Sequence, residues 1–249
     1  MIRPLRGGFT VHSFDVDAFQ TLALPALAGY LQEVAARHAV ELGCGLDALR
    51  ARGLTWVLMR QRIEVPGPVV LGDALEVETW PSGIERLLVS REFVVRRAGV
   101  EVARSSSAWL VVDLATRRPI RPADVLDPAL RPVGEALAPI ARHLPAPGAG
   151  AAERAFRVRF QDIDANLHVN NTTYLAWALE TITRERWTSQ RPAAVEVHFV
   201  AESRFGDTVI ACASAEGDEL RHAIVRDGDR RELARLRTRW VPRAPSATP

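Results

Sequence analysis

The residues best suited to chemistry lie together in one polar string, FQDIDANLHVNNTTY, over residues 160–174. Acid, amide and imidazole side chains occupy every second position of its first half, and an asparagine pair follows: Asp162, Asp164, Asn166, His168, Asn170 and Asn171. A positioned carboxylate or imidazole can move a proton as a general acid or base, and an amide can orient a water molecule or a carbonyl group. The string therefore brings together side chains that can do acid–base chemistry.

A helix is expected directly after this string. Tyr174, Ala178, Thr181 and Ile182 recur at the spacing of one buried helical face. The residues just before it are good helix caps: Asn170, Asn171 and Thr172. Backbone N–H groups at a helix N-terminus have no partner inside the helix, so an anionic intermediate could be held at this end.

The composition is that of an ordinary soluble globular protein. Of the 249 residues, 47% are hydrophobic and 25% are charged. No apolar run approaches the roughly 18 residues that a membrane span needs. The N-terminal stretch MIRPLRGGFTVHSF lacks the apolar core of a secretory signal. We therefore expect a cytoplasmic protein without a membrane span.

Charge and cysteine content exclude several classes of function. The net charge of +2 is too small to indicate a nucleic-acid-binding protein. The two cysteines, Cys44 and Cys212, make neither a disulfide framework nor a metal site of the usual spacing, so free thiols and no metal are expected. All 32 basic residues are arginines, which excludes a catalytic lysine and its Schiff-base chemistry.

The chain contains an internal repeat. When Phe9 is aligned with Phe156, an offset of 147 positions, Asp15 and Asp17 fall on Asp162 and Asp164. Other identities at this offset are Val11 with Val158, Ala18 with Ala165, Glu33 with Glu180 and Arg37 with Arg184. Later landmarks match at shorter offsets: Gly72-Asp73 with Gly206-Asp207, and Trp109 with Trp240. Two copies of one unit are therefore predicted, with extra residues in the first copy.

Each copy is expected to contain a strand, a long helix and then four strands. In the first copy the predicted strands are 9–14, 54–65, 74–80, 87–96 and 102–112, and the predicted helix is 22–42. In the second copy the predicted strands are 156–160, 193–199, 208–214, 220–225 and 232–241, and the predicted helix is 171–187. An antiparallel sheet with one long helix on it would bury that helix on a single face.

The expected organisation has four segments. Residues 1–123 form the first unit, 154–243 form the second, and 244–249 form a disordered tail. The linker is expected at 124–153, because the stretch from Thr116 to Glu153 contains seven prolines. Some helix is expected within it, at about 124–142.

The string DIDANLHVNNTTY resembles the active-site segment of the acyl-acyl carrier protein thioesterases, which have a double hotdog fold. Similar stretches elsewhere are YLQEVAARHAVELG, GLTWVLMRQRIEV, VETWPSG, SSSAWLVVDLATRRP and ESRFGDTV. The resemblance covers nearly the whole chain, from about Phe9 to Val241. It implies an α+β double hotdog of two tandem units, each an antiparallel sheet wrapped on a long helix. It also implies a thioester hydrolase that releases free fatty acid from acyl-acyl carrier protein in fatty acid biosynthesis.

In that family the second unit carries the catalytic groups, and the first supplies much of the acyl-chain pocket. The family's catalytic Asp, Asn and His fall on Asp164, Asn166 and His168, and its later carboxylate falls on Glu202. Many plant members have a cysteine beside this glutamate. Here the neighbour is Ser203, which favours carboxylate-activated water over a cysteine nucleophile.

The resemblance leaves the division of labour open. Glu202, or otherwise Asp164, is expected to be the general base. Asn166 would orient the water or the carbonyl, while His168 or a backbone N–H near Val169 would meet the oxyanion. Asp164 could instead hold His168 or Asn166 in place. Substrate contact is expected of Val169, Asn170 and Asn171, and Asp162 is expected to be a turn or cap carboxylate.

The first copy should be chemically silent, because Phe19 and Thr21 stand where the second copy has Asn166 and His168. Two alternatives to the leading interpretation are an acyl-CoA thioesterase of the same fold and a non-catalytic hotdog protein that binds an acyl thioester. The expected partner is acyl carrier protein, no cofactor is expected, and the chain would act as a monomeric pseudo-dimer or a homodimer.

Overall fold

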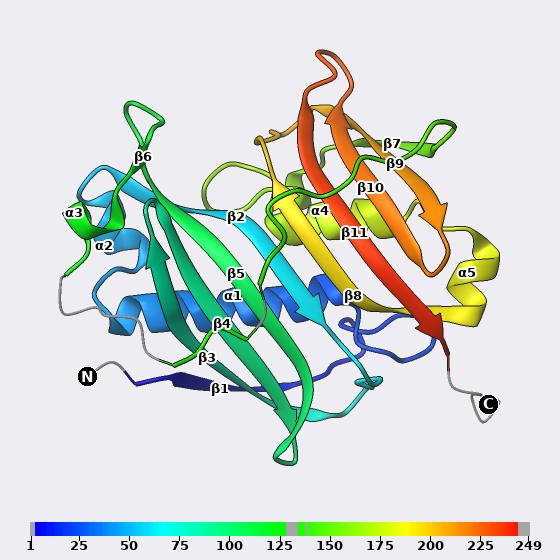
Figure 1. Ribbon diagram of the computed structural model, residues 1–249, viewed down its shortest axis with the longest axis horizontal. Helices are drawn as coiled ribbons and strands as arrows, with labels where there is room; N and C mark the ends of the chain where they lie inside the picture. Colours follow the sequence, from blue (N-terminus) through cyan, green and yellow to red (C-terminus); the bar gives the residue numbers. More distant parts are fainter. Residues whose placement is uncertain (1–2, 128–133, 138, 244–249) are drawn as a thin grey trace. The chain divides into compact units, whose positions relative to one another are not determined.

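The computed structural model describes residues 3–127, 134–137 and 139–243. Its chain divides into two compact units, Met1–Ile140 and Ala141–Pro249 (Figure 1). Each unit has its own antiparallel sheet and its own central helix, α1 in the first and α4 in the second. The predicted disordered tail, 244–249, lies outside the described residues.

The first unit contains a five-stranded antiparallel sheet in the order β1-β3-β4-β5-β2, and the short β6 pairs with β5. The strands are β1 Leu5–Thr10, β2 Leu54–Glu64, β3 Ala74–Glu85, β4 Leu88–Arg97, β5 Val100–Asp113 and β6 Pro119–Ile120. The helices are α1 Leu24–Glu41, α2 Leu46–Arg50 and α3 Pro122–Val125.

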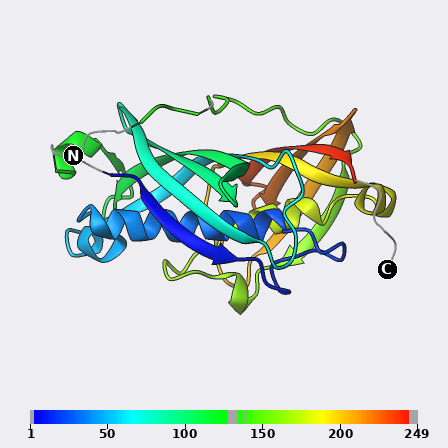
Figure 2. The same ribbon diagram turned by 90° about the horizontal axis from the view of Figure 1, so that it is seen from below.

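Helix α1 lies along one face of the first sheet (Figure 2). Its buried residues recur every three or four positions: Leu24, Leu27, Ala28, Leu31, Val34, Ala35, His38 and Ala39. A fully buried leucine or valine contributes about 1.5–3 kcal/mol relative to exposure, so this face holds the helix on its sheet. Pro25 is tolerated because it lies in the first turn, where its missing N–H would have had no partner.

The second unit repeats the strand order, β7-β9-β10-β11-β8. Its strands are β7 Ala152–Arg157, β8 Gln190–Phe199, β9 Thr208–Glu216, β10 Glu219–Arg226 and β11 Glu232–Pro242. A 3-10 turn, η1 Phe160–Asp162, precedes α4 Asn171–Leu179 and α5 Arg184–Ser189. From Ala234 to Trp240 in β11 every second residue is buried, as the alternation in the sequence predicts: Ala234, Leu236, Thr238 and Trp240.

The internal repeat is confirmed in the backbone hydrogen bonds of the two units. Val11 N–H donates to Asp73 O at 3.0 Å, and Val158 N–H donates to Asp207 O at 2.9 Å. The glycines before these aspartates, Gly72 and Gly206, both have φ of 85°. These equivalent positions match the offsets read from the sequence.

Several predicted boundaries are wrong. The first strand of each copy ends earlier than expected, at Thr10 and Arg157, because the following residues fold into tight turns. The helix expected at 171–187 is two helices, since the Thr181 hydroxyl donates to Ala178 O at 2.6 Å and Thr183 caps α5. In the linker, helix is present only in α3, which ends at Val125, among the residues described between 122 and 142.

Within the described part of the chain, no helix is both long and apolar enough to cross a membrane.

Candidate active site

Asp164 organises the loop that carries the predicted catalytic residues. Its Oδ1 accepts the backbone N–H of Asn166 at 2.7 Å, and its Oδ2 accepts the side-chain amide of Asn166 at 3.4 Å. Its backbone N–H donates to His168 O at 2.9 Å, which closes the turn. Leu167 lies at the tip with φ of 61°, a conformation that costs a non-glycine residue roughly 1–2 kcal/mol. Asp164 is therefore hydrogen-bonded to Asn166 through both carboxylate oxygens, and its catalytic role stays a prediction.

His168 and Glu202 are in direct contact. The imidazole Nε2 lies 3.1 Å from Glu202 Oε2. The side chains are 22% and 39% exposed, so the pair is half-buried and open to a substrate from outside. At this distance an Nε2–H can donate a hydrogen bond to the Glu202 carboxylate. The other ring nitrogen, Nδ1, is then the one that can accept a proton.

A backbone bond brings these two distant stretches of chain together. Val169 N–H donates to Ser203 O at 3.1 Å, so the residues that precede them, His168 and Glu202, face one another. Ile163 and Val169 also form an isolated β-bridge that closes the base of the loop. The four residues predicted as catalytic therefore come from two adjoining loops at one end of the second unit.

The three residues predicted to contact substrate have different surroundings. Asn170 caps α4, because its Oδ1 accepts the N–H and the hydroxyl of Thr172 at 3.0 and 2.9 Å. Asn171 is the first residue of α4 and is half-buried. Val169 is 4% exposed. Its N–H would have to leave Ser203 O before it could meet an oxyanion.

Asp162 is a capping carboxylate, as predicted. It is 3% exposed, and its Oδ2 accepts the backbone N–H of Arg159 at 2.7 Å. The Arg159 guanidinium also donates to Oδ1 at 2.9 Å. The carboxylate is thus fully used in holding the turn η1.

The equivalent loop of the first copy has the same backbone and different side chains. Asp17 Oδ1 accepts the N–H of Phe19 at 2.9 Å, and Asp17 N–H donates to Thr21 O at 2.8 Å. Gln20, the counterpart of Leu167, has φ of 58°. The loop is therefore duplicated in full, but Phe19 and Thr21 give it neither the amide nor the imidazole.

Sequence reasoning missed three residues behind the site. Ser203 is fully buried, and its hydroxyl donates to Asp207 Oδ2 at 2.9 Å. Its N–H donates to the Tyr174 hydroxyl oxygen at 3.1 Å. Burial raises the pKa of Tyr174, so its hydroxyl stays neutral. A signal was present: the first copy has Leu27 and Val69 at the positions of Tyr174 and Ser203.

No three histidine, cysteine, aspartate or glutamate side chains are grouped to hold a metal ion among the residues for which the structure gives positions. The two cysteines are buried and free.

Comparison with protein families matches both halves of the chain. A family model described as "Acyl-ACP thioesterase N-terminal domain" matches residues 5–128, and one described as "Acyl-ACP thioesterase C-terminal domain" matches residues 147–242. The chain belongs to the acyl-ACP thioesterase family.

Relatives with assigned activities are similar over most of this chain. A chloroplastic acyl-acyl carrier protein hydrolase of Cuphea viscosissima is 27% identical over 263 aligned positions, which cover 98% of this chain and 64% of the relative. A chloroplastic palmitoyl-acyl carrier protein thioesterase of Gossypium hirsutum is 26% identical, with 94% of this chain and 63% of the relative covered. This chain thus spans less than two thirds of the length of these relatives.

Solved structures of the family confirm the predicted α+β double hotdog fold. An acyl-ACP thioesterase of Bacteroides thetaiotaomicron has a TM-score of 0.79 and 26% identity, with 96% of this chain and 98% of that chain covered. A 12:0-ACP thioesterase of Umbellularia californica has a TM-score of 0.87 at 23% identity, over 96% and 98% of the two chains. At that identity the second match shows the fold alone.

Proposed function

We propose that this protein is a thioesterase that hydrolyses acyl chains from acyl carrier protein and releases the free fatty acid. The observation that carries this proposal is the 3.1 Å contact between His168 and Glu202 beside an Asn166 held by Asp164. The equivalent loop of the first unit, residues 15–21, lacks these groups, and we call it the twin loop. Family membership supports the substrate, because the curated relatives are named for acyl-acyl carrier protein.

In the proposed reaction a water molecule attacks the carbonyl carbon of the thioester while its proton passes to the His168–Glu202 pair. The contact through Nε2 favours Nδ1 of His168 as the acceptor, with Glu202 orienting the ring and stabilising its charge. Asn166 orients the water or the carbonyl through its amide. The C–S bond then breaks, and the leaving thiolate takes the proton back. The products are a fatty acid and the carrier thiol.

Other parts of the proposal come from the sequence and the family. The first unit would supply most of the acyl-chain pocket, 124–153 would be the linker, and substrate would touch Val169, Asn170 and Asn171. We further propose that the protein acts in the cytoplasm, as a monomer or a homodimer. Sedimentation of the purified chain at several concentrations separates these two assemblies.

The decisive experiment gives purified protein a series of acyl chain lengths on carrier protein, and the same chains on coenzyme A. We expect faster hydrolysis from carrier protein. Faster hydrolysis from coenzyme A would make the protein an acyl-CoA thioesterase instead. Tight binding of the acyl thioester without hydrolysis would make it a non-catalytic acyl-thioester-binding protein.

Alanine variants test the residues. Asn166→Ala and His168→Ala should each lower kcat by about 10²–10⁴-fold, because each removes a group that moves a proton or orients a reactant. Thr21→Ala in the twin loop is the matched control and should leave kcat unchanged. Full activity in both Asn166→Ala and His168→Ala would reject this site.

A further inference from the structure

Ser203 is held by three hydrogen bonds directly behind the candidate active site. Its N–H donates to the Tyr174 hydroxyl oxygen at 3.1 Å, and its own hydroxyl donates to Asp207 Oδ2 at 2.9 Å. Its carbonyl accepts Val169 N–H at 3.1 Å. Ser203 has no exposed surface, and Tyr174 is 3% exposed. Every polar group of this serine is therefore fixed by a partner.

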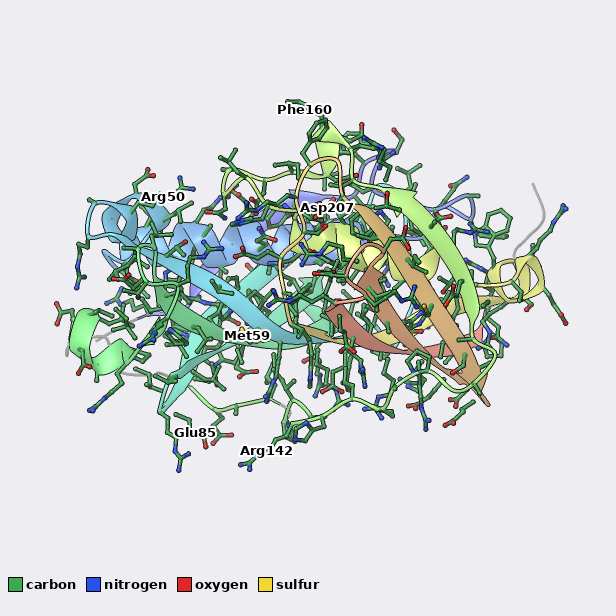
Figure 3. The ribbon with its side chains drawn as sticks, turned by 90° about the horizontal axis from the view of Figure 1, so that it is seen from above. Arg50, Met59, Glu85, Arg142, Phe160 and Asp207 are labelled. Carbon is green, nitrogen blue, oxygen red and sulfur yellow. The ribbon has the colours of Figure 1, made fainter. Side chains whose placement is uncertain are left out.

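The other members of this cluster are also fixed. Asp207 Oδ2 accepts the N–H of Arg204 at 2.9 Å as well as the serine hydroxyl. Val158 N–H donates to Asp207 O at 2.9 Å. Figure 3 labels Asp207 and Phe160 at the same end of the second unit, where these two loops meet. The cluster thus joins α4, the 160–170 loop and the 200–207 loop.

The first copy folds the same turn without the two hydroxyl groups. Leu22 N–H donates to Val69 O at 2.8 Å, which is the equivalent of the Val169–Ser203 bond. Asp73 Oδ2 accepts Val70 N–H at 2.9 Å, as Asp207 accepts Arg204 N–H. Leu27 and Val69, however, stand in place of Tyr174 and Ser203. The turn forms in the first copy without these hydroxyl groups, so the hydroxyl groups of Tyr174 and Ser203 are not required for its fold.

The backbone held by these hydroxyl groups is directly joined to the two candidate catalytic residues. Val169 directly follows His168, and Ser203 directly follows Glu202. A shift of the backbone at Ser203 would therefore move the Glu202 carboxylate away from the imidazole it contacts at 3.1 Å. A displacement of about 1 Å in a catalytic group can cost on the order of 10²-fold in rate.

We propose that Tyr174 and Ser203 are positioning residues that hold the Glu202 carboxylate against His168. This inference rests on the proposed thioester hydrolysis, and it adds to that proposal the residues that set its geometry. Both residues are buried, so they act through the backbone that they hold and not by direct contact with the substrate. Ser203, whose buried hydroxyl donates to Asp207, serves as an anchor and not as a nucleophile.

The test uses Tyr174→Phe and Ser203→Ala, with Tyr30→Phe as the matched control. Tyr30 is the other of the chain's two tyrosines, and its hydroxyl donates to Asp15 Oδ2 at 2.6 Å in the first unit. Both Tyr→Phe changes remove one buried or half-buried hydroxyl. We expect kcat to fall about tenfold in Tyr174→Phe and Ser203→Ala with KM within twofold, and Ser203→Thr to retain the kcat of the wild type. Tyr30→Phe should leave kcat unchanged.

Two further measurements separate positioning from general loss of structure. In a Glu202→Gln background, Tyr174→Phe should cause no additional loss of kcat, because the two changes act through one contact. Independently of turnover, the ¹⁵N resonance of the His168 ring, assigned with His168→Ala, should shift in Tyr174→Phe and stay in place in Tyr30→Phe.

The inference is overturned if Tyr174→Phe is folded and keeps both the kcat and the His168 resonance of the wild type. It is also overturned if the losses in Tyr174→Phe and Glu202→Gln multiply. If the wild type hydrolyses no acyl thioester, the proposed function fails alone, and the His168 resonance still decides the positioning role.

Discussion

Two buried histidines should make the folded protein sensitive to mild acid, and His222 shows the reason most clearly. It has no exposed surface and lies within a directed chain of hydrogen bonds. Trp240 Nε1–H donates to the Thr238 hydroxyl at 2.9 Å, and that hydroxyl donates to His222 Nε2 at 2.8 Å. Because the Thr181 hydroxyl donates to Ala178 O at 2.6 Å, it accepts from His222 Nδ1–H at 3.3 Å, and this tautomer leaves Nε2 as the acceptor. A second proton on the ring would reverse one of these bonds and bury a charge.

Burial accordingly lowers the pKa of His222 from 6.5 to about 4. The pKa of His38 is also lowered to about 4, first by burial and then by the nearby Arg91 guanidinium. A depressed histidine pKa means that the unfolded chain binds the proton more readily. The contribution of these two histidines to the free energy of unfolding is therefore full above pH 6.5 and falls as the pH drops toward 4. Each histidine would cost the folded state about 2 kcal/mol at pH 5 and about 3 kcal/mol at pH 4.

The assay is urea unfolding at pH 7 and pH 5, followed by circular dichroism. His222→Gln removes the titrating group and keeps an amide that can donate and accept, so its stability should fall by about 2 kcal/mol less than that of the wild type between these pH values. The exposed His143 provides the control, and His143→Gln should keep the pH dependence of the wild type. An equal drop in the wild type and His222→Gln would refute the reasoning.

Three further outcomes follow from the duplicated loops. Glu202→Gln should lower kcat for hydrolysis of acyl-acyl carrier protein by about 10²–10⁴-fold. The melting temperature, followed by circular dichroism, should stay nearly unchanged. Gly72→Ala and Gly206→Ala should each lower stability by roughly 1–2 kcal/mol, because φ of 85° strains alanine, and only Gly206→Ala should also reduce kcat. Thr21→His should fail to restore turnover to His168→Ala, because the first copy offers no carboxylate at the position of Glu202; recovery of turnover would contradict the assignment.

The secondary structure was largely predictable because its signals are local. Alternating burial along β11 and the helical stripe of α1 are both visible as periodic patterns in the sequence. The errors lie where a polar side chain competes with regular structure. Thr181 fits the helical spacing in the sequence. In the structure its hydroxyl donates to Ala178 O, just after the end of α4.

The sequence marks the candidate catalytic residues in a different way. Asp164, Asn166 and His168 stand in one short string, and the first copy has Asp17, Phe19 and Thr21 at the same positions, without the amide and the imidazole. Their types and spacing are properties of the chain itself. Glu202 was chosen only through the family resemblance, since alone it looks like a solvated charge at a strand end.

The sequence by itself determined the duplicated units, the polar string and the residue types available for chemistry. Only the tertiary structure decided that Glu202 meets His168 at 3.1 Å and that Ser203 is anchored by Tyr174 and Asp207. These contacts join residues far apart in the chain through hydrogen bonds. Such bonds produce no periodic pattern in the sequence. Hydrogen-bond geometry, unlike hydrophobic pattern, depends on where the fold places each donor and acceptor.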